Sequence, residues 1–195
     1  MIIGLTGGIG SGKSMVSLTL KELGCYIVDG DKMSRDVQQK GSKLVYELAE
    51  AFGDSIITED GELIRKALGA IAFSSEENTA KLNRIMSKAM NKRFHELLDE
   101  GIASGRIVIL DIPMLFESGW DKYADENWVV VCPEDIRIRR VIERDGIDRQ
   151  QVLDRISKQM SDEARVARAD IVINNTGSME DLERIVTDLI NERSR

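Results

Sequence analysis

The feature that most constrains this chain is an eight-residue pattern near its start, Gly7-Gly8-Ile9-Gly10-Ser11-Gly12-Lys13-Ser14. An apolar run of strand length precedes it, and an amphipathic stretch of helix length follows it. Glycines allow positive φ and close backbone approach, so successive N–H groups can point at phosphate oxygens, and the following helix adds the positive end of its dipole. A G-x-x-x-x-G-K-[ST] pattern in this context predicts a loop that binds a nucleoside triphosphate.

Two side chains of this phosphate loop (residues 7–14) carry specific expectations. We expect Lys13 to reach the β- and γ-phosphates and the Ser14 hydroxyl to join the shell of a bound Mg²⁺. The alternative is a glycine-rich turn that binds nothing, and agreement at all eight positions disfavours it. The loop predicts the ligand class but leaves the chemistry open.

The remaining hydrophobic pattern predicts an α/β fold. Short, continuously apolar runs at 2–6, 25–29, 107–111, 128–131 and 171–174 are typical of strands buried on both faces. Helix-length stretches alternate with them at about 13–23, 32–51, 79–100, 135–144, 149–159 and 179–193. This alternation predicts a three-layer sandwich of the P-loop NTPase type, with a five-stranded parallel sheet between layers of helices.

The spacing of the strands predicts one domain, residues 1–195, with helical excursions. The interval from Val28 to Ile107 is too long for a single crossover helix, and residues 60–104 read as helical throughout. A helical insertion after the second strand, at about 60–104, is the simplest interpretation.

Charge is distributed unevenly along the chain. The sequence holds 27 Lys and Arg against 34 Asp and Glu, a net charge of −7. Residues 137–168 alone hold nine cationic and six acidic residues, a net charge of +3. Such a segment, at about 140–160, suits a helical lid that closes over a polyanion, with Arg140 and Arg144 four residues apart on one face. Solvated helices with internal salt bridges are the alternative.

The same composition limits the partners. The net negative charge argues against nucleic acid, and no apolar run approaches the roughly 18 residues of a membrane span. Cys25 and Cys132 form no C-x-x-C pair and lie in apolar surroundings, which favours reduced, buried thiols in a cytoplasmic protein. We expect small-molecule partners and a monomer or weak homo-oligomer.

Carboxylates follow two of the predicted strands. Asp111 ends the third strand and is expected to bind Mg²⁺, directly or through water; a polar terminator of the strand is the alternative. Asp31 follows the second strand and could take a proton from an attacking hydroxyl, or simply cap the next helix.

In combination these motifs resemble the dephospho-coenzyme A kinase family. The resemblance starts at residues 4–14 and continues, in order along nearly the whole chain, through Asp29-Gly30-Asp31 with Arg35, Asp60-Gly61-Glu62-Leu63-Ile64-Arg65 with Leu68, Asp111-Ile112-Pro113-Met114-Leu115-Phe116-Glu117, Arg140-Val141-Ile142-Glu143-Arg144-Asp145, Gln159-Met160 and Ala169-Asp170-Ile171-Val172-Ile173-Asn174-Asn175.

The resemblance implies ATP-dependent phosphorylation of the ribose 3′-hydroxyl of dephospho-coenzyme A, the last step of coenzyme A synthesis. It implies that residues 60–104 form the coenzyme A subdomain and residues 140–160 the lid. Asp31 matches the proposed catalytic base and Arg140 the lid arginine, which act with Lys13. The implied ATP-binding residues are Gly8, Gly10, Ser11, Gly12, Lys13, Ser14 and Met15, and the implied acceptor-site residues are Arg65, Leu115, Phe116 and Glu117.

Three positions depart from the family pattern. Gly30 replaces the alanine of Asp-Ala-Asp, and Met15 stands where a threonine usually follows the loop serine. Ser87-Lys88 occupies the place of a His-Pro pair in the inserted domain, so no acceptor role is carried over from that stretch.

Other functional classes fit less well. A switch GTPase needs Asn-Lys-x-Asp, but Asn91-Lys92 is followed by Arg93-Phe94. A non-catalytic nucleotide-binding module would not need Lys13, Ser14, Asp31 and Asp111 together. A nucleotide or nucleoside kinase is the remaining alternative among kinases.

Overall fold

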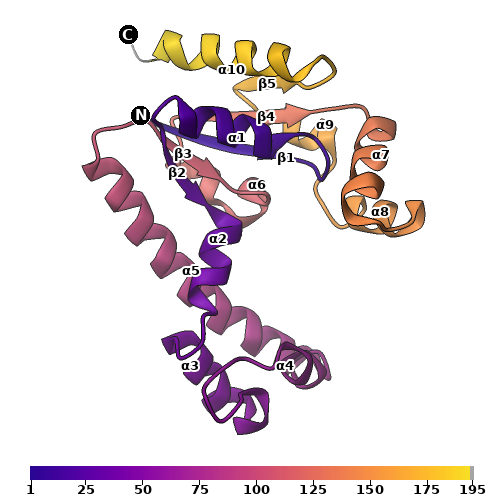
Figure 1. Ribbon diagram of the computed structural model, residues 1–195. Coiled ribbons are helices and arrows are strands. Elements are labelled where there is room, and N and C mark those ends of the chain that lie inside the picture. Colours follow the sequence, from indigo (N-terminus) through magenta and orange to yellow (C-terminus); the bar gives the residue numbers. More distant parts are fainter. Residues whose placement is uncertain (194–195) are drawn as a thin grey trace. The chain divides into compact units, whose positions relative to one another are not determined.

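A computed structural model describes residues 1–193, and its contacts divide the chain into two compact units. The core unit contains residues 1–29 and the chain from residue 101 onward, and the helical unit contains Gly30–Glu100. The core unit holds all the strands of the described sheet: β1 (Ile2–Gly7), β2 (Tyr26–Asp29), β3 (Val108–Asp111), β4 (Glu126–Val131) and β5 (Ile171–Asn174) (Figure 1).

The strands form a five-stranded parallel sheet in the order β2-β3-β1-β4-β5. β1 lies at the centre, where Ile3 pairs with Ile109 of β3 and Thr6 pairs with Val129 of β4. The carboxyl end of β1 therefore opens into the phosphate loop beside the ends of β3 and β4. The predicted fold class and all five predicted strands are confirmed.

Helices cover both faces of the sheet, as predicted. α1 (Lys13–Glu22) and α10 (Met179–Arg193) lie together on one face (Figure 1). There they enclose the main core, formed by Ile3, Leu5, Val16, Leu20, Cys25, Ile109, Trp128, Val130, Ile173, Leu182, Val186 and Ile190. Because side chains alternate along a strand, Gly4 of β1 faces the side of the sheet opposite to Ile3 and Leu5. A Cβ there would lie 2.6 Å from Leu115, so glycine lets the short helix α6 (Leu115–Ser118) pack against this face.

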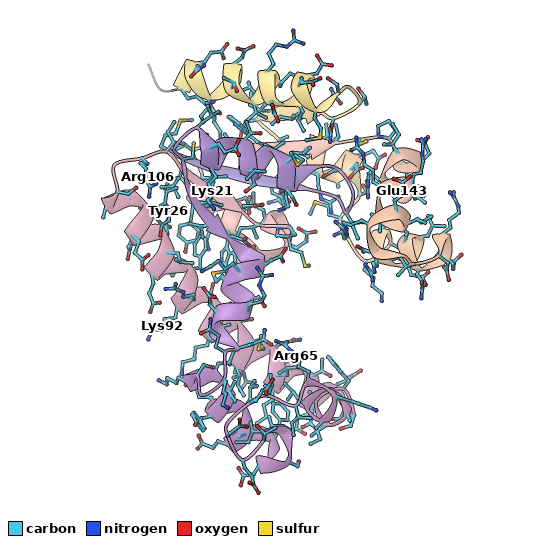
Figure 2. The ribbon with its side chains drawn as sticks, in the orientation of Figure 1. Lys21, Tyr26, Arg65, Lys92, Arg106 and Glu143 are labelled. Atoms are coloured by element: carbon cyan, nitrogen blue, oxygen red, sulfur yellow. The ribbon has the colours of Figure 1, made fainter. Side chains whose placement is uncertain are left out.

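Three short helices follow β4 in the core unit: α7 (Glu134–Asp145), α8 (Arg149–Ile156) and α9 (Asp162–Val166). α7 and α8 pack on each other through Ile138, Val141 and Val152, with Ile9 of the phosphate loop at the edge of this cluster. The small 3₁₀ helix η2 (Trp120–Tyr123) precedes β4. At the β2 edge, the Arg106 guanidinium lies 5.1 Å from the Tyr26 ring (Figure 2).

The helical unit contains α2 (Gly30–Val37), α3 (Lys43–Phe52), the 3₁₀ helix η1 (Asp54–Ile56), α4 (Arg65–Ala72) and most of α5 (Glu76–Ala103). Its own core joins α3, η1, α4 and α5 through Leu44, Leu48, Ala49, Ile56, Leu68, Ala72 and Leu82. The predicted apolar face of the helix at 79–100 lies partly in this core and is buried again at Phe94 and Leu98.

Two helix predictions need correction. The single helix expected over 32–51 is wrong, because residues 38–42 separate α2 from α3. Gly41 there has φ of 70°, and the Ser42 hydroxyl caps α3 by accepting the Val45 N–H at 3.3 Å. Residues 60–104 are also not wholly helical, since Leu63 forms an antiparallel bridge with Ile57 and residues 73–75 separate α4 from α5.

Both cysteines are free and buried, as predicted. Among the described helices, none combines the length and the hydropathy that crossing a membrane requires.

Candidate active site

The phosphate loop connects β1 to α1 in a compact turn. The Ser11 N–H donates to Gly8 O at 3.0 Å, and Gly12 has φ of 96° at the residue before α1. The Asn175 side-chain amide, which follows β5, donates to Ser11 O at 2.8 Å and occupies the space where a Cβ of residue 12 would lie. Glycine at position 12 is therefore required both by the backbone conformation and by this packing.

Lys13 and Asp111 meet at the carboxyl ends of β1 and β3. The Lys13 ammonium donates to Asp111 Oδ1 in an ion pair, and both side chains are largely buried. Asp111 is thereby brought beside the first turn of α1, which also carries Ser14. The structure therefore brings together Lys13, Ser14 and Asp111, three of the residues predicted to bind phosphate and Mg²⁺.

The other predicted loop residues divide into backbone and side-chain contributors. The side chain of Ser11 is buried and that of Met15 packs against the main core, so these two residues present only their backbone to a ligand. Ser14 is exposed, which leaves its hydroxyl accessible. Gly8 and Gly10 have no side chain, and at both positions a Cβ would lie 2.7 Å from Arg137 atoms.

Arg140 and Arg144 have different partners, although they lie four residues apart on α7. Arg140 Nη1 lies 3.5 Å from Cys132 Sγ and 3.7 Å from the position of a Cβ on Gly12, so this guanidinium is next to the phosphate loop. Arg144 pairs with Asp145 at 2.7 Å, and this hydrogen bond raises the pKa of the guanidinium. Burial raises the pKa of the Cys132 thiol, and the nearby Arg140 charge opposes that rise.

Two residues that hold the loop have no role assigned to them from the sequence, although Gln159 lies in one of the matched motifs. Arg137 is 3% exposed and its Nε donates to Ile9 O at 2.9 Å, while Gln159 Oε1 accepts the Ile9 N–H at 3.0 Å. Arg137 is one of nine cationic residues in a basic window. Its position on the inner face of α7, next to Ile138 and Val141, was the available signal.

The three residues of the segment 115–117 differ in their exposure to solvent. Leu115 and Phe116 are buried, and the Arg168 guanidinium lies 4.4 Å from the Phe116 ring centroid. Glu117 is exposed, and its Oε1 accepts the Met160 N–H at 3.3 Å. Only Glu117 of these three presents a polar side chain to solvent.

Two predicted residues belong to the helical unit. Asp31 lies exposed in the first turn of α2. Arg65 begins α4, exposed, and its Nη1 donates to Gln38 Oε1 at 2.6 Å (Figure 2). Within this unit, Arg65 therefore links the start of α4 to the residue that follows α2.

Comparisons with known proteins agree with this arrangement. The family model of dephospho-CoA kinase matches residues 1–181. A dephospho-CoA kinase of Carboxydothermus hydrogenoformans is 43% identical over 191 residues, covering 95% of this chain and 91% of that protein. One from Corynebacterium diphtheriae is 41% identical over 189 residues, covering 96% and 94%.

Solved structures show the same fold. A crystal structure of a protein from Thermus thermophilus has a TM-score of 0.82 and 35% identity, covering 98% of this chain and 97% of that one. A dephospho-CoA kinase from Campylobacter jejuni has a TM-score of 0.75 and 22% identity, covering 99% and 96%. The match over nearly the whole length, with the phosphate loop and Asp111 in place, means that this chain belongs to the dephospho-CoA kinase family.

Proposed function

We propose that this chain transfers the γ-phosphoryl group of ATP to the ribose 3′-hydroxyl of dephospho-coenzyme A, giving coenzyme A and ADP. The family match over residues 1–181 carries the proposal. The geometry of the core unit supports the donor half of it, because a phosphate loop begins α1 and presents Lys13 beside a strand-end carboxylate.

ATP would bind with its phosphates on the backbone of residues 8–15. The backbone N–H groups of Gly10, Gly12 and the first turn of α1 favour negative charge, and the largely buried Lys13 ammonium adds a full positive charge. In the structure Asp111 neutralises that ammonium. Phosphate oxygens would then compete with Asp111 for Lys13.

Mg²⁺ fits the oxygen donors at this place. Asp111 and Ser14 supply one carboxylate and one hydroxyl, and no cluster of three or more metal-binding side chains occurs among residues 1–193. A magnesium ion in a kinase takes few protein ligands and shares the substrate phosphates, so such a sparse donor set is sufficient. The bound ion would neutralise charge on the β- and γ-phosphates.

Asp31 and Arg140 would act on the two reacting groups. Asp31 would orient the acceptor hydroxyl and take its proton, a role that needs an accessible carboxylate and agrees with its exposure on α2. Arg140 would stabilise charge on the transferred phosphoryl group from its place beside Gly12.

The acceptor half rests on the family resemblance. Within the single kinase domain of residues 1–195, helices of the stretch 60–104 with Arg65 would hold dephospho-coenzyme A. The resemblance also gives Leu115, Phe116 and Glu117 acceptor roles, and of these three only Glu117 is exposed. Residues 140–160 would close as a lid. The free thiols of Cys25 and Cys132 support a cytoplasmic location.

An acceptor panel tests the proposal. The purified chain is incubated with Mg²⁺, ATP and, separately, dephospho-coenzyme A, adenosine, AMP and shikimate, and ADP release is measured. We expect ADP release with dephospho-coenzyme A alone, a ³¹P resonance of a new 3′-phosphomonoester, and loss of both in Lys13→Ala. Transfer to a nucleoside or nucleotide without transfer to dephospho-coenzyme A would contradict the proposal.

A further inference from the structure

Two buried arginines in the core unit share one carboxylate behind the phosphate loop. Arg137 of α7 is 3% exposed and Arg165 of α9 is 1% exposed. Asp162, in the first turn of α9, accepts Arg137 Nη1 with Oδ2 and Arg165 Nη1 with Oδ1, the second at 3.0 Å. One carboxylate therefore holds two guanidinium groups in a fixed relation.

Arg137 transmits this arrangement to the loop. Its Nε donates to Ile9 O at 2.9 Å, and its Nη2 lies 2.7 Å from where a Cβ on Gly8 would be. A guanidinium is planar and its donors diverge in fixed directions. Once Asp162 holds Nη1, the direction in which Nε meets the loop is set as well.

The contact at Ile9 determines how the next N–H points. The carbonyl of Ile9 and the N–H of Gly10 belong to one trans peptide, so they point in opposite directions. Because Arg137 attracts the carbonyl, the Gly10 N–H is directed away from Arg137. In a phosphate loop, an N–H held in this way is pre-organised to meet a phosphate oxygen.

The Asp162 carboxylate also compensates buried positive charge. Two buried guanidinium groups next to each other are costly unless compensated, and removing one partner of such a buried pair leaves an uncompensated charge. Within the described residues, Arg165 Nε and Nη2 make no hydrogen bond, so this side chain is held by the bond from its Nη1 to Asp162. The cluster keeps a net charge of +1 beside a loop that binds a polyanion.

We propose that Asp162 is a positioning residue for ATP: it orients Arg137, and Arg137 holds the Gly8–Ile9 segment of the phosphate loop in its binding conformation. Asp162 also offsets part of the charge of the buried Arg165, which has no direct part in the loop. The inference deepens the proposed function but rests only on its ATP-binding half, so an acceptor other than dephospho-coenzyme A would leave it intact.

The test measures the Kd for a non-hydrolysable ATP analogue by calorimetry. We expect D162N to raise Kd by about tenfold, the effect of losing one charge-assisted contact. R165M, which leaves the Asp162–Arg137 pair in place, should change Kd less than twofold. D121N is the matched surface control, because Asp121 accepts Arg168 Nη2 at 2.7 Å in another ion pair of the core unit; it should also change Kd less than twofold.

A charge-balanced variant guards against misfolding. D162N/R165M removes one charge of each sign, keeps the cluster at +1, and should show the same rise in Kd as D162N. In an R137Q background, D162N should add no further rise, because the carboxylate acts through Arg137. If D162N/R165M lowers Tm while its Kd stays at the wild-type value, or if the D162N and R137Q effects on Kd multiply, Asp162 is only a structural residue and the proposal fails.

Discussion

At the scale of single residues, the proposed chemistry depends on carboxylates in two different surroundings. Asp111 is buried against Lys13 at the end of β3, whereas Asp31 is exposed in the first turn of α2. The first surroundings suit a ligand for a cation, and the second suit a group that exchanges a proton with a bound hydroxyl. Removing the proton-accepting capacity of Asp31 without changing its size separates these roles.

Asp31→Asn is expected to preserve folding and to leave the affinities for ATP and dephospho-coenzyme A within a few-fold. The amide can still orient a hydroxyl but cannot take its proton, so kcat should fall by roughly 10²–10⁴. A loose transition state needs little early deprotonation, which favours the lower end of that range. Equilibrium binding and single-turnover transfer, measured side by side, check this. Unchanged transfer would reduce Asp31 to a helix cap, and lost ATP binding would assign it to the magnesium shell.

Arg140→Ala is expected to lower kcat by roughly 10²–10³ with a smaller effect on ATP affinity, since a contact to developing charge acts mainly in the transition state. Arg139→Ala is the matched control: this arginine lies on the same helix, is exposed, and pairs only loosely with Asp135 at 3.9 Å. Steady-state kinetics and thermal melts of both variants distinguish a catalytic role of Arg140 from a structural one. A loss of Tm alone in Arg140→Ala would make it a structural residue.

At the scale of residues, the sequence predicts correctly the placement of a motif whose residues are contiguous in the chain. The phosphate loop is contiguous, so its eight residues were sufficient to place it between β1 and α1. Arg137 illustrates the limit. Its burial depends on Asp162, twenty-five positions away on α9, and on the carbonyl of Ile9. A helical pattern shows which face of α7 points inward, but it does not show which groups from other segments that face contacts.

At the scale of elements, α8 is a short helix whose start is well defined. Asp148 accepts the Gln151 N–H at 2.8 Å, and Gln151 Oε1 accepts the Asp148 N–H at 3.1 Å, a reciprocal capping box. Eight residues give little intrinsic helix stability, so the cap and the contact of Val152 with α7 hold this part of the proposed lid.

Asp148→Ala should therefore destabilise α8 by about 1 kcal/mol. We expect amide hydrogen exchange across Arg149–Ile156 to accelerate about fivefold, with α1 and α10 unchanged. Ser42→Ala, which removes the cap of α3 in the helical unit, is the control and should leave α8 exchange unaltered. Equal acceleration in both variants would mean that exchange reports global unfolding.

Element boundaries were the weakest sequence predictions. The stretch 32–51 has an apolar pattern that continues across Gly41 and so predicts one helix, where the structure has α2 and α3 as separate helices. Gly41 and Ser42 were the available signals, a residue suited to positive φ followed by an N-cap. A single Gly is tolerated in many helices, and only the packing of α3 on η1 and α4 decides that the chain turns here.

At the scale of the whole molecule, acid stability depends on carboxylates that tie distant segments together. Arg193 of α10 donates to Glu126 of β4 at 2.6 Å, and this hydrogen bond lowers the pKa of the Glu126 carboxyl. Because the pKa is lowered in the folded state, the pair stabilises the fold above the ordinary carboxyl range. That contribution is lost as the pH falls through the folded-state pKa.

Glu126→Gln should lower Tm by about 1–3 °C at pH 7, as expected for a partly exposed ion pair. The difference from wild type should shrink as the pH falls through the lowered folded-state pKa of Glu126, because the wild-type carboxyl then becomes protonated too. Thermal melts at pH 7 and pH 3 test this. Glu192→Gln serves as control, since Glu192 lies 3.8 Å from the same arginine but is largely exposed. A Tm difference that is constant with pH would contradict the assignment.

The order of the strands also governs when the nucleotide site becomes complete during synthesis. The phosphate loop leaves the ribosome early, yet the contacts that shape it come from Arg137, Gln159 and Asn175. The strand that precedes the loop, β1, pairs with β3 and β4, which lie more than 100 residues downstream. A nascent chain stalled before Asn175 therefore carries the full loop sequence without the amide that holds Ser11 O. The complete set of contacts that a bound ATP could stabilise exists only once residue 175 has been translated.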